Sequence, residues 1–439
     1  MMTWDPRAIE VLDRLRRAGH RAVLEGGCVR DSLLSIPLHD YDAATSARPE
    51  EVMAACGDLH VVETGLKHGT VTVFNGGLPV EVTTFRREGA YSDHRRPDRV
   101  DFTTDLAQDL ARRDFTINAM AWEAEGVVDL FGGRADLEAG IVRCVGDPDR
   151  RFGEDALRLL RGLRLAAQLD FSIHPDTAAA IRRHVPELSH VAWERIAAEF
   201  VRLICSPGAG RVLLDFPEVV VQIIPELAPA VGFDQRNPHH CYDVYTHSVR
   251  AMEGVPPEPV LRLAALLHDV GKPAVFSLDD QGVGHFYGHP RVSAALTDQA
   301  LTRLRLDRAT REEAVVLVAR HDLPVEVGEA WAGRWLSRLG EDTFFRLLAL
   351  KRGDALACAH GEEEPEHLIR VEELARELLT RRPCLTLKEL AVNGRDAMAA
   401  GLAGPAIGRA LKGLLARVAE GSLPNRREVL LRELARKEE

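Results

Sequence analysis

Short runs in which apolar and polar residues alternate fill about the first third of the chain, and this period predicts strands. The predicted strands are residues 22–24, 40–44, 61–64, 70–74 and 79–85. The turn Asn75-Gly76-Gly77 joins the last two as a hairpin, because these residue types accept the backbone angles of a tight turn. Before the first strand, apolar positions at helical spacing predict a helix over residues 5–19.

Strand signals stop at about residue 140, and the rest of the chain reads as nearly all helical. Residues 152–164 are amphipathic, with leucines on one face and charged residues on another. Considered alone, such a charged face is most simply a salt-bridged surface exposed to solvent. Together the two regions predict the α+β class, with a mixed-sheet head followed by helical parts.

Composition limits the classes of protein that fit. A chain of 439 residues should hold several domains, because single hydrophobic cores rarely grow this large. Seven cysteines without a Cys-x-x-Cys pair favour reduced thiols in a cytoplasm over a zinc ribbon. The chain has no apolar run of about 18 residues and no signal-peptide pattern, so we expect a cytoplasmic protein without a membrane span.

Net charge bears on the choice of partner. The formal net charge is −11, which by itself argues against nucleic acid, where Lys and Arg meet phosphate. Net charge does not report local patches, however, and acidic catalytic and metal-binding centres would mask a basic groove. Charge therefore leaves RNA binding open.

Two motifs near the start combine into candidate phosphate chemistry. Gly26 and Gly27 follow an apolar run, and the N–H groups of such a turn can face phosphate oxygens. Asp40 and Asp42 would lie on one face of an extended segment, where two carboxylates can hold Mg²⁺. Glu81 is a third carboxylate for two-metal nucleotidyl transfer, although a charged residue in a strand more often faces solvent.

These motifs resemble the nucleotidyltransferase superfamily, in the branch of tRNA CCA-adding enzymes and bacterial poly(A) polymerases. The matching stretches are 24–31, 40–42, 109–121 and 129–137. The resemblance implies a polymerase-β-like head in which Asp40 and Asp42 hold Mg²⁺ and Glu81 completes the catalytic set. It also implies nucleotide binding by Gly26, Gly27, Arg30, Arg113, Asp114, Asn118, Asp155, Arg158, Arg161 and Arg164.

Some of these residues also carry physical arguments. The guanidinium of Arg113 can bind phosphate as a fork. Asp114 and Asn118, four residues apart, would share one face of a helix and could bond a ribose hydroxyl. In the family that the chain resembles, an Asp and an Arg three residues apart pair with the edge of the incoming base. Asp155 and Arg158 match that motif, which would select C or A.

A second recognisable unit starts before His247. The apolar helix 261–267 ends in His268-Asp269, where an imidazole and a carboxylate adjoin and can chelate a metal. This pattern resembles the HD phosphohydrolase domain, whose fold also persists as an inert scaffold. The resemblance implies the ligands His247, His268, Asp269 and Asp354, with His289 and His321 for a second divalent metal such as Mg, Mn, Ni or Co.

The resemblance also divides the chain into four expected parts. These are a catalytic head over 1–138, a helical neck for nucleobase recognition and RNA binding over 139–230, an HD domain over 231–360, and a tRNA-binding helical tail over 361–439. The acidic stretch 361–375 is expected to be a surface break. Polar residues 86–105 are expected to form a loop, either a solvated connector or a lid over nucleotide or RNA.

The expected activity is template-independent addition of C and A to the tRNA 3′ end from CTP and ATP, with release of pyrophosphate. The HD domain adds an expected phosphohydrolase or phosphodiesterase activity. Within the same class, the alternatives are an A-only enzyme, a CC-only enzyme and a poly(A) polymerase. In a different class, the chain would be an HD phosphohydrolase whose degenerate head binds RNA. The sequence does not determine the oligomeric state.

Overall fold

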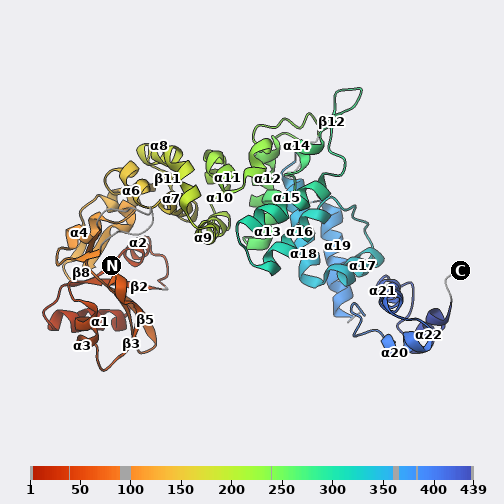
Figure 1. Cartoon of the computed structure of the whole chain (residues 1–439), viewed down its shortest axis with the longest axis horizontal. Helices are drawn as coiled ribbons and strands as arrows, with labels where there is room; N and C mark the ends of the chain where they lie inside the picture. The colour runs from red at the N-terminus through yellow and green to blue at the C-terminus, as the bar shows by residue number, and fades with distance from the viewer. Residues whose placement is uncertain are drawn as a thin grey trace. The chain divides into compact units, whose positions relative to one another are not determined.

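The computed structural model describes residues 3–38, 40–88, 100–238, 240–358, 365–381 and 384–436. The chain divides into two compact units, residues 1–223 and 224–439, and each is described by itself (Figure 1). The four-part division expected from the sequence is finer than this one and stays a prediction.

The first unit begins with a seven-stranded sheet in the order β3-β4-β5-β2-β1-β8-β9. Its strands are β1 Ala22–Glu25, β2 Tyr41–Thr45, β3 His60–Gly65, β4 Thr70–Asn75, β5 Leu78–Thr84, β8 Met120–Glu123 and β9 Gly126–Asp129. β2 and β5 run parallel and the other neighbours run antiparallel, so the sheet is mixed. The expected strands and the hairpin at 75–77 are confirmed to within a residue or two.

Helix α1 (Pro6–Arg17) packs against strands β1, β2, β4 and β5. Its buried residues form one helical stripe and are Ala8, Val11, Leu12 and Leu15. In β5, the buried Val80 and Val82 flank the exposed Glu81. Because side chains alternate between the faces of a strand, Glu81 points to the face of the sheet opposite those valines.

The remaining helices of the first unit are α2 Gly27–Leu33, α3 Pro49–Ala55, α4 Leu106–Ala111, α5 Gly133–Ala139, α6 Pro148–Glu154, α7 Leu157–Leu169, α8 Pro175–His184, α9 Trp193–Ile204, α10 Ala209–Asp215 and α11 Pro217–Ile223. The short 3-10 helices are η1 Leu66–His68, η2 Thr116–Asn118 and η3 Val185–His190. Two small ribbons complete the unit, and they are β6 Arg86–Glu88 with β7 Val100–Phe102, and β10 Ile141–Val142 with β11 Ser172–Ile173.

The loop expected over residues 86–105 is wrong at its two ends. There β6 and β7 pair as an antiparallel ribbon, because backbone N–H and C=O groups of the two ends satisfy each other. Residues 89–99, which hold most of the expected connector or lid, lie outside the described residues.

The helix expected over 152–164 is interrupted. α6 ends at Glu154, Asp155 is extended with φ −148°, and α7 begins at Leu157. The side chain of Asp155 accepts a hydrogen bond from the backbone N–H of Leu157 at 3.0 Å, as a helix cap does. Asp155 therefore precedes a new helix, and its expected place on one continuous helical face is corrected.

The second unit is helical apart from the two-residue strands β12 Ser277–Leu278 and β13 Gly284–His285. Its helices are η4 Pro225–Ala230, α12 Val244–Glu253, α13 Pro259–Leu267, α14 Lys272–Val275, α15 His289–Arg303, α16 Arg308–Arg320, α17 Glu329–Leu339, α18 Glu341–Leu356, α19 Glu366–Thr380, α20 Gly394–Ala399, α21 Pro405–Ala419 and α22 Arg427–Ala435. Helices α12, α13, α16 and α18 pack against one another. Among the described residues, no helix is both long and apolar enough to cross a membrane.

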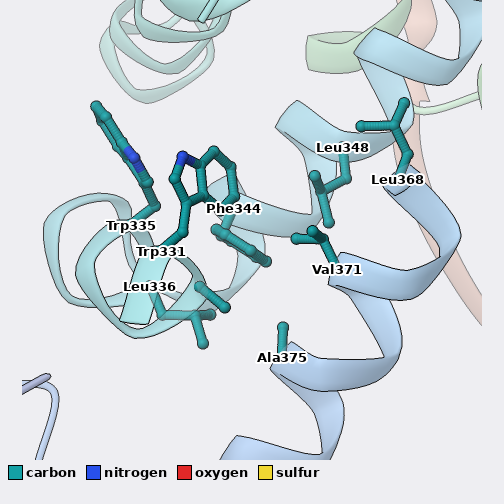
Figure 2. Close-up of a cluster of buried hydrophobic side chains, with 9 residues drawn as sticks. Trp331, Trp335, Leu336, Phe344, Leu348, Leu368, Val371 and Ala375 are labelled. Carbon is teal, nitrogen blue, oxygen red and sulfur yellow. The ribbon is translucent and has the colours of Figure 1, made fainter. Parts of the chain in front are cut away.

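Helices α17, α18 and α19 share a hydrophobic cluster (Figure 2). Trp331 lies 6.0 Å from Phe344, measured between ring centroids. From α19, Leu368, Val371 and Ala375 are buried at helical spacing. The surface break expected over 361–375 is therefore wrong from residue 366 onward, because these apolar positions anchor the helix despite its acidic composition. Residues 361–364 lie outside the described residues.

Candidate active site

The glycine turn lies where β1 leaves the sheet. Gly26 has φ +73°, a conformation that favours glycine, and its N–H donates to the Met120 carbonyl at 3.1 Å. Helix α2 starts at the next residue, Gly27. A Cβ placed on Gly26 would lie 2.7 Å from Nη1 of Arg113. The missing side chain therefore lets this guanidinium approach the turn.

Two of the three predicted catalytic carboxylates are neighbours on adjacent strands, and the third lies just before one of those strands. Asp42 on β2 and Glu81 on β5 are register partners in the parallel pair, so both side chains leave the same face of the sheet. Asp40 lies just before β2. Burial raises the pKa of Glu81, and the charges of Asp42 and Asp40 raise it further. The three carboxylates thus act on one another electrostatically, and Asp42 and Glu81 leave the sheet as neighbours on one face.

Asp42 also faces a positive charge. Burial raises its pKa, Arg113 opposes that rise, and Asp40 adds to it. The oxygen-rich group of Asp40, Asp42 and Glu81 fits the preference of Mg²⁺ for oxygen ligands. Arg113 forms an ion pair with Glu25, which lies beside Asp42 in the register of β1 and β2, so the structure brings one expected phosphate ligand close to Asp42.

The second predicted phosphate ligand, Arg30, is buried on α2. Its Nη1 donates to Oδ1 of Asn118 at 2.7 Å, and its Nη2 lies 2.7 Å from Oδ1 of Asp31. The structure thus brings Arg30 and Asn118 together, although 88 residues separate them in the chain. Such a buried network orients a guanidinium, because few of its donors remain unpaired.

The helix expected to carry Asp114 and Asn118 on one face is wrong. α4 ends at Ala111, and Asn118 lies in the short η2, so the two residues are not successive positions of one α-helix. Asp114 instead lies 2.7 Å from Nη2 of Arg161, measured at its Oδ2. Burial acts to raise the pKa of Asp114, but the charges of Arg161 and its neighbours lower it overall.

The predicted base-recognition residues are held by ion pairs to other segments. Oδ2 of Asp155 lies 2.9 Å from Nη2 of Arg195 on α9. Nη1 of Arg158 lies 2.5 Å from Oε2 of Glu154. The simpler expectation is that Asp155 forms a salt bridge with the residue three positions later, Arg158, on the same helix. This is wrong, because the partner of Asp155 is Arg195 on α9. Arg164 is held likewise, with Nε 2.6 Å from Oε2 of Glu199 on α9.

Sequence reasoning missed one charged residue beside the turn. Glu25 is 2% exposed at the end of β1 and forms an ion pair with Arg113. Burial raises its pKa to about 7, against the lowering effect of Arg113. The available signal was a charged residue that ends an apolar strand, since a buried charge needs a partner.

In the second unit, four predicted metal ligands form one buried group. His247 comes from α12, His268 and Asp269 follow α13, and Asp354 lies on α18; their ligand atoms lie within 4.8 Å of one another. Nε2 of His247 lies 3.0 Å from Oδ1 of Asp354. Nε2 of His268 lies 3.2 Å from Oδ2 of Asp269. Helix ends far apart in the sequence thus supply one constellation.

His289 and His321 form a second group with the other oxygen of Asp269. Their Nε2 atoms lie 3.0 Å apart, and each faces Oδ1 of Asp269, at 3.2 Å and 3.6 Å. Asp269 therefore stands between the two groups, in the position of a bridging carboxylate. An open cavity of about 350 Å³ reaches this region, and Lys272 and Tyr287 are among its lining residues.

The hydrogen bonds of the four imidazoles favour bound cations. Each Nδ1 faces a backbone carbonyl, at 2.7 Å for His268 and His321, 2.9 Å for His289 and 3.3 Å for His247. A carbonyl only accepts, so each Nδ1 carries a hydrogen and each Nε2 is the nitrogen that faces the carboxylates, where it can bind a cation once it is deprotonated. Burial opposes protonation of His268, yet Asp269 and Asp354 raise its pKa to about 10. The cluster attracts positive charge, which divalent metals supply.

Family models match most of the chain. A poly A polymerase head domain matches residues 22–143, and a polymerase A region described as an RNA and SrmB-binding site matches 170–230. An HD domain matches 239–357, and a tRNA nucleotidyltransferase domain 2 matches 332–434.

A curated relative decides the family. The CCA-adding enzyme of Levilactobacillus brevis is 34% identical over 432 residues, which cover 96% of this chain and 95% of the relative. The chain belongs to the CCA-adding enzyme family. The family member of Ligilactobacillus salivarius is 46% identical, but over 211 residues that cover 48% of this chain and 52% of that enzyme. For this relative, the chain aligns with only about half of the length.

A solved CCA-adding enzyme shares the fold. The crystal structure of the Bacillus stearothermophilus enzyme in complex with CTP has a TM-score of 0.74 at 29% identity, covering 98% of this chain and 96% of that one. The CCA-adding enzyme fold, with a mixed-sheet head and a helical body, confirms the α+β class expected from the sequence.

Proposed function

We propose that this CCA-adding enzyme homologue completes tRNA 3′ ends with C and A from CTP and ATP. The observation that carries the proposal is the shared register of Asp42 and Glu81, with Asp40 adjacent and Arg113 over the glycine turn. The names of the relatives and the CTP complex of the Bacillus stearothermophilus enzyme support the choice of substrates.

The carboxylates and arginines divide the work of phosphoryl transfer. Asp40 and Asp42 would hold Mg²⁺, which when bound neutralises triphosphate charge and makes the tRNA 3′-hydroxyl more acidic. Glu81 would orient that hydroxyl or accept its proton. The oxygen of the tRNA 3′-hydroxyl attacks the α-phosphorus of the nucleotide. The bond between that phosphorus and the oxygen that bridges to the β-phosphate breaks, and pyrophosphate leaves. Arg113 and Arg30 would donate to phosphate oxygens.

Base selection is assigned to the start of α7. The Asp155 carboxylate would accept from the exocyclic amine that cytosine and adenine both carry, and Arg158 would donate to a ring acceptor. Asp114, Asn118, Arg161 and Arg164 would bind nucleotide around this pair. The ion pairs from Glu154 and Arg195 support the assignment, because they hold both reading groups in place.

The remaining parts have proposed roles of their own. We assign tRNA binding to the neck over 139–230 and to the tail over 361–439. The matches to an RNA-binding region and to a tRNA nucleotidyltransferase domain support these assignments. Each of the seven cysteines, all of which lie in the described part of the chain, is a thiol and not half of a disulfide, which supports a reducing cytoplasm.

Labelled CTP and ATP, supplied with tRNA ending at the discriminator base, at CC or at CCA, test the proposal. We expect CCA on the first substrate, A on the second and nothing on the third. Addition only to the tRNA that ends in CC would indicate an A-only enzyme. Addition that stops after CC on the first substrate would indicate a CC-only enzyme. Long A tails would indicate a poly(A) polymerase, and no addition a degenerate head.

A second activity, hydrolysis of phosphate esters, is favoured by the complete ligand groups around Asp269. The donors would hold two divalent ions such as Mn²⁺, Co²⁺, Ni²⁺ or Mg²⁺, which supply Lewis acidity and an activated water. Assays of p-nitrophenyl phosphate and bis(p-nitrophenyl) phosphate hydrolysis, each carried out with one of these divalent metals added, test this second activity. The Asp269→Asn variant should lose this hydrolysis and keep nucleotide addition.

A further inference from the structure

Glu25 is a buried acid in the middle of the head sheet. It is the last residue of β1, which lies between β2 and β8, and it pairs with Ala121 of β8. It is 2% exposed. A carboxylate in such a place is unfavourable unless a positive group meets it.

That positive group is Arg113. Nη2 of Arg113 contacts Oε1 of Glu25, and the arginine side chain is 19% exposed. Nη1 donates to the carbonyl of Asn118 at 3.3 Å and packs over the bare backbone of Gly26. Three neighbours thus fix the guanidinium: a carboxylate, a carbonyl and a glycine turn.

The sheet places Glu25 in line with the catalytic carboxylates. Leu24 of β1 is the register partner of Ala43 on β2, so one further antiparallel step brings Glu25 beside Asp42. Asp42 is in turn the partner of Glu81 on β5. Asp42 and Glu81 are exposed, whereas Glu25 is covered. Because Glu25 is covered and its Oε1 contacts Arg113, this residue acts through the arginine, while its Oε2 is buried and has no hydrogen-bond partner among the described residues.

We infer that Glu25 is a positioning residue for nucleotidyl transfer, which holds Arg113 over Gly26 within reach of the triphosphate. The inference rests on the proposed function, in which Arg113 binds phosphate. The contact with Oε1 of Glu25 and the hydrogen bond to the Asn118 carbonyl hold the guanidinium at two of its nitrogens, which limits its movement.

A double-mutant cycle on the full-length enzyme tests this. With tRNA saturating, Glu25→Gln should lower kcat/KM for CTP about tenfold, because a displaced arginine loses its phosphate contact. In an Arg113→Lys background, where no fork remains, the same change should cost less than about twofold. Glu25→Asp, which keeps the charge on a shorter side chain, should recover part of the loss.

Glu123→Gln is the matched control. This variant makes the same substitution on the neighbouring strand β8. It breaks an exposed ion pair in which Nε of Arg21 lies 2.6 Å from Oε1 of Glu123, so kcat/KM should not change. Wild-type kcat/KM in Glu25→Gln, a gain in kcat/KM, or an equal loss in both backgrounds would overturn the inference. If Glu25→Gln does not fold, Glu25→Asp in the two backgrounds gives the same comparison. An inactive wild-type enzyme would instead overturn the proposed function.

Discussion

Asp42 occupies a strand position between two buried residues, Tyr41 and Ala43, and this alternation turns its carboxylate out of the core. Glu81 does the same between Val80 and Val82. The acids therefore meet without disturbing the packing of the sheet. At this scale, chemistry and stability are separable, because the charged groups contribute little to the core.

Asp42→Asn tests that separation. We expect nucleotide addition to fall about a thousandfold or more, because the amide cannot replace a charged metal ligand. The melting temperature should hold or rise, since one of three mutually repelling charges is removed. CTP incorporation and a thermal melt measure the two quantities, with Asp13→Asn on α1 as the surface control. Activity within tenfold of wild type would contradict the assignment.

Gly26→Ala and Gly77→Ala form a matched pair. Both glycines have positive φ, but a Cβ on Gly26 meets Arg113, whereas one on Gly77 meets nothing within 4 Å. Each variant should lose about 1–2 kcal/mol of unfolding free energy to backbone strain. Only Gly26→Ala should also weaken CTP binding, measured by titration. Equal CTP affinity in the two variants would show that Arg113 does not need the bare turn.

At the scale of elements, the break between α6 and α7 sets the positions of the two residues proposed to read the base, Asp155 and Arg158. Asp155 ends one helix and caps the next, and Arg195 of α9 holds it from the side. The same carboxylate thus has a structural and a proposed recognition role, which substitution can separate.

Asp155→Asn and Asp155→Ala make that separation. Asparagine can still cap α7, so the melting temperature of Asp155→Asn should stay close to that of the wild type. Asp155→Ala should lose about 0.5–2 kcal/mol of unfolding free energy, because alanine cannot cap the helix. Both should reduce the preference for CTP over UTP, because neither keeps the charged acceptor. Single-nucleotide incorporation and thermal melts provide the readouts. Unchanged discrimination in both variants would refute the template role.

Elements were predictable where their signals were local. Alternation and glycine turns marked the strands of the head, and the apolar helix before His268 marked α13. The break at Asp155 was not predictable from the helix propensity of its neighbours, because Glu154 and Ala156 on either side are both good helix formers. The pairing of Glu25 with Arg113, and of Asp114 with Arg161, depends on tertiary contacts that no local pattern reports.

At the scale of the whole molecule, the chain consists of two compact units that carry different candidate sites. The candidate transfer site lies within residues 1–223, and the two ligand groups that share Asp269 lie within 224–439. Each unit also has its own hydrophobic clusters. Independent cores lead us to expect more than one unfolding transition.

Calorimetry with and without metal tests this organisation. Mn²⁺ at a hundred times its dissociation constant should stabilise the unit that binds it by about 2.7 kcal/mol. One transition should therefore move up, and Asp269→Asn should abolish that movement while the other transition stays. A single transition that shifts as a whole in both proteins would contradict the division.

The register between β2 and β5 has a consequence for how the gene can change. Deleting a single codon between positions 78 and 81 would shift the register of β5 by one residue. The Glu81 side chain would then point to the covered face of the sheet, among the buried valines. Losing one in the neighbouring tight turn would only reshape an outer bend. Deletion scanning of this hairpin should therefore give a sharp boundary, with inactive proteins on one side and working ones on the other.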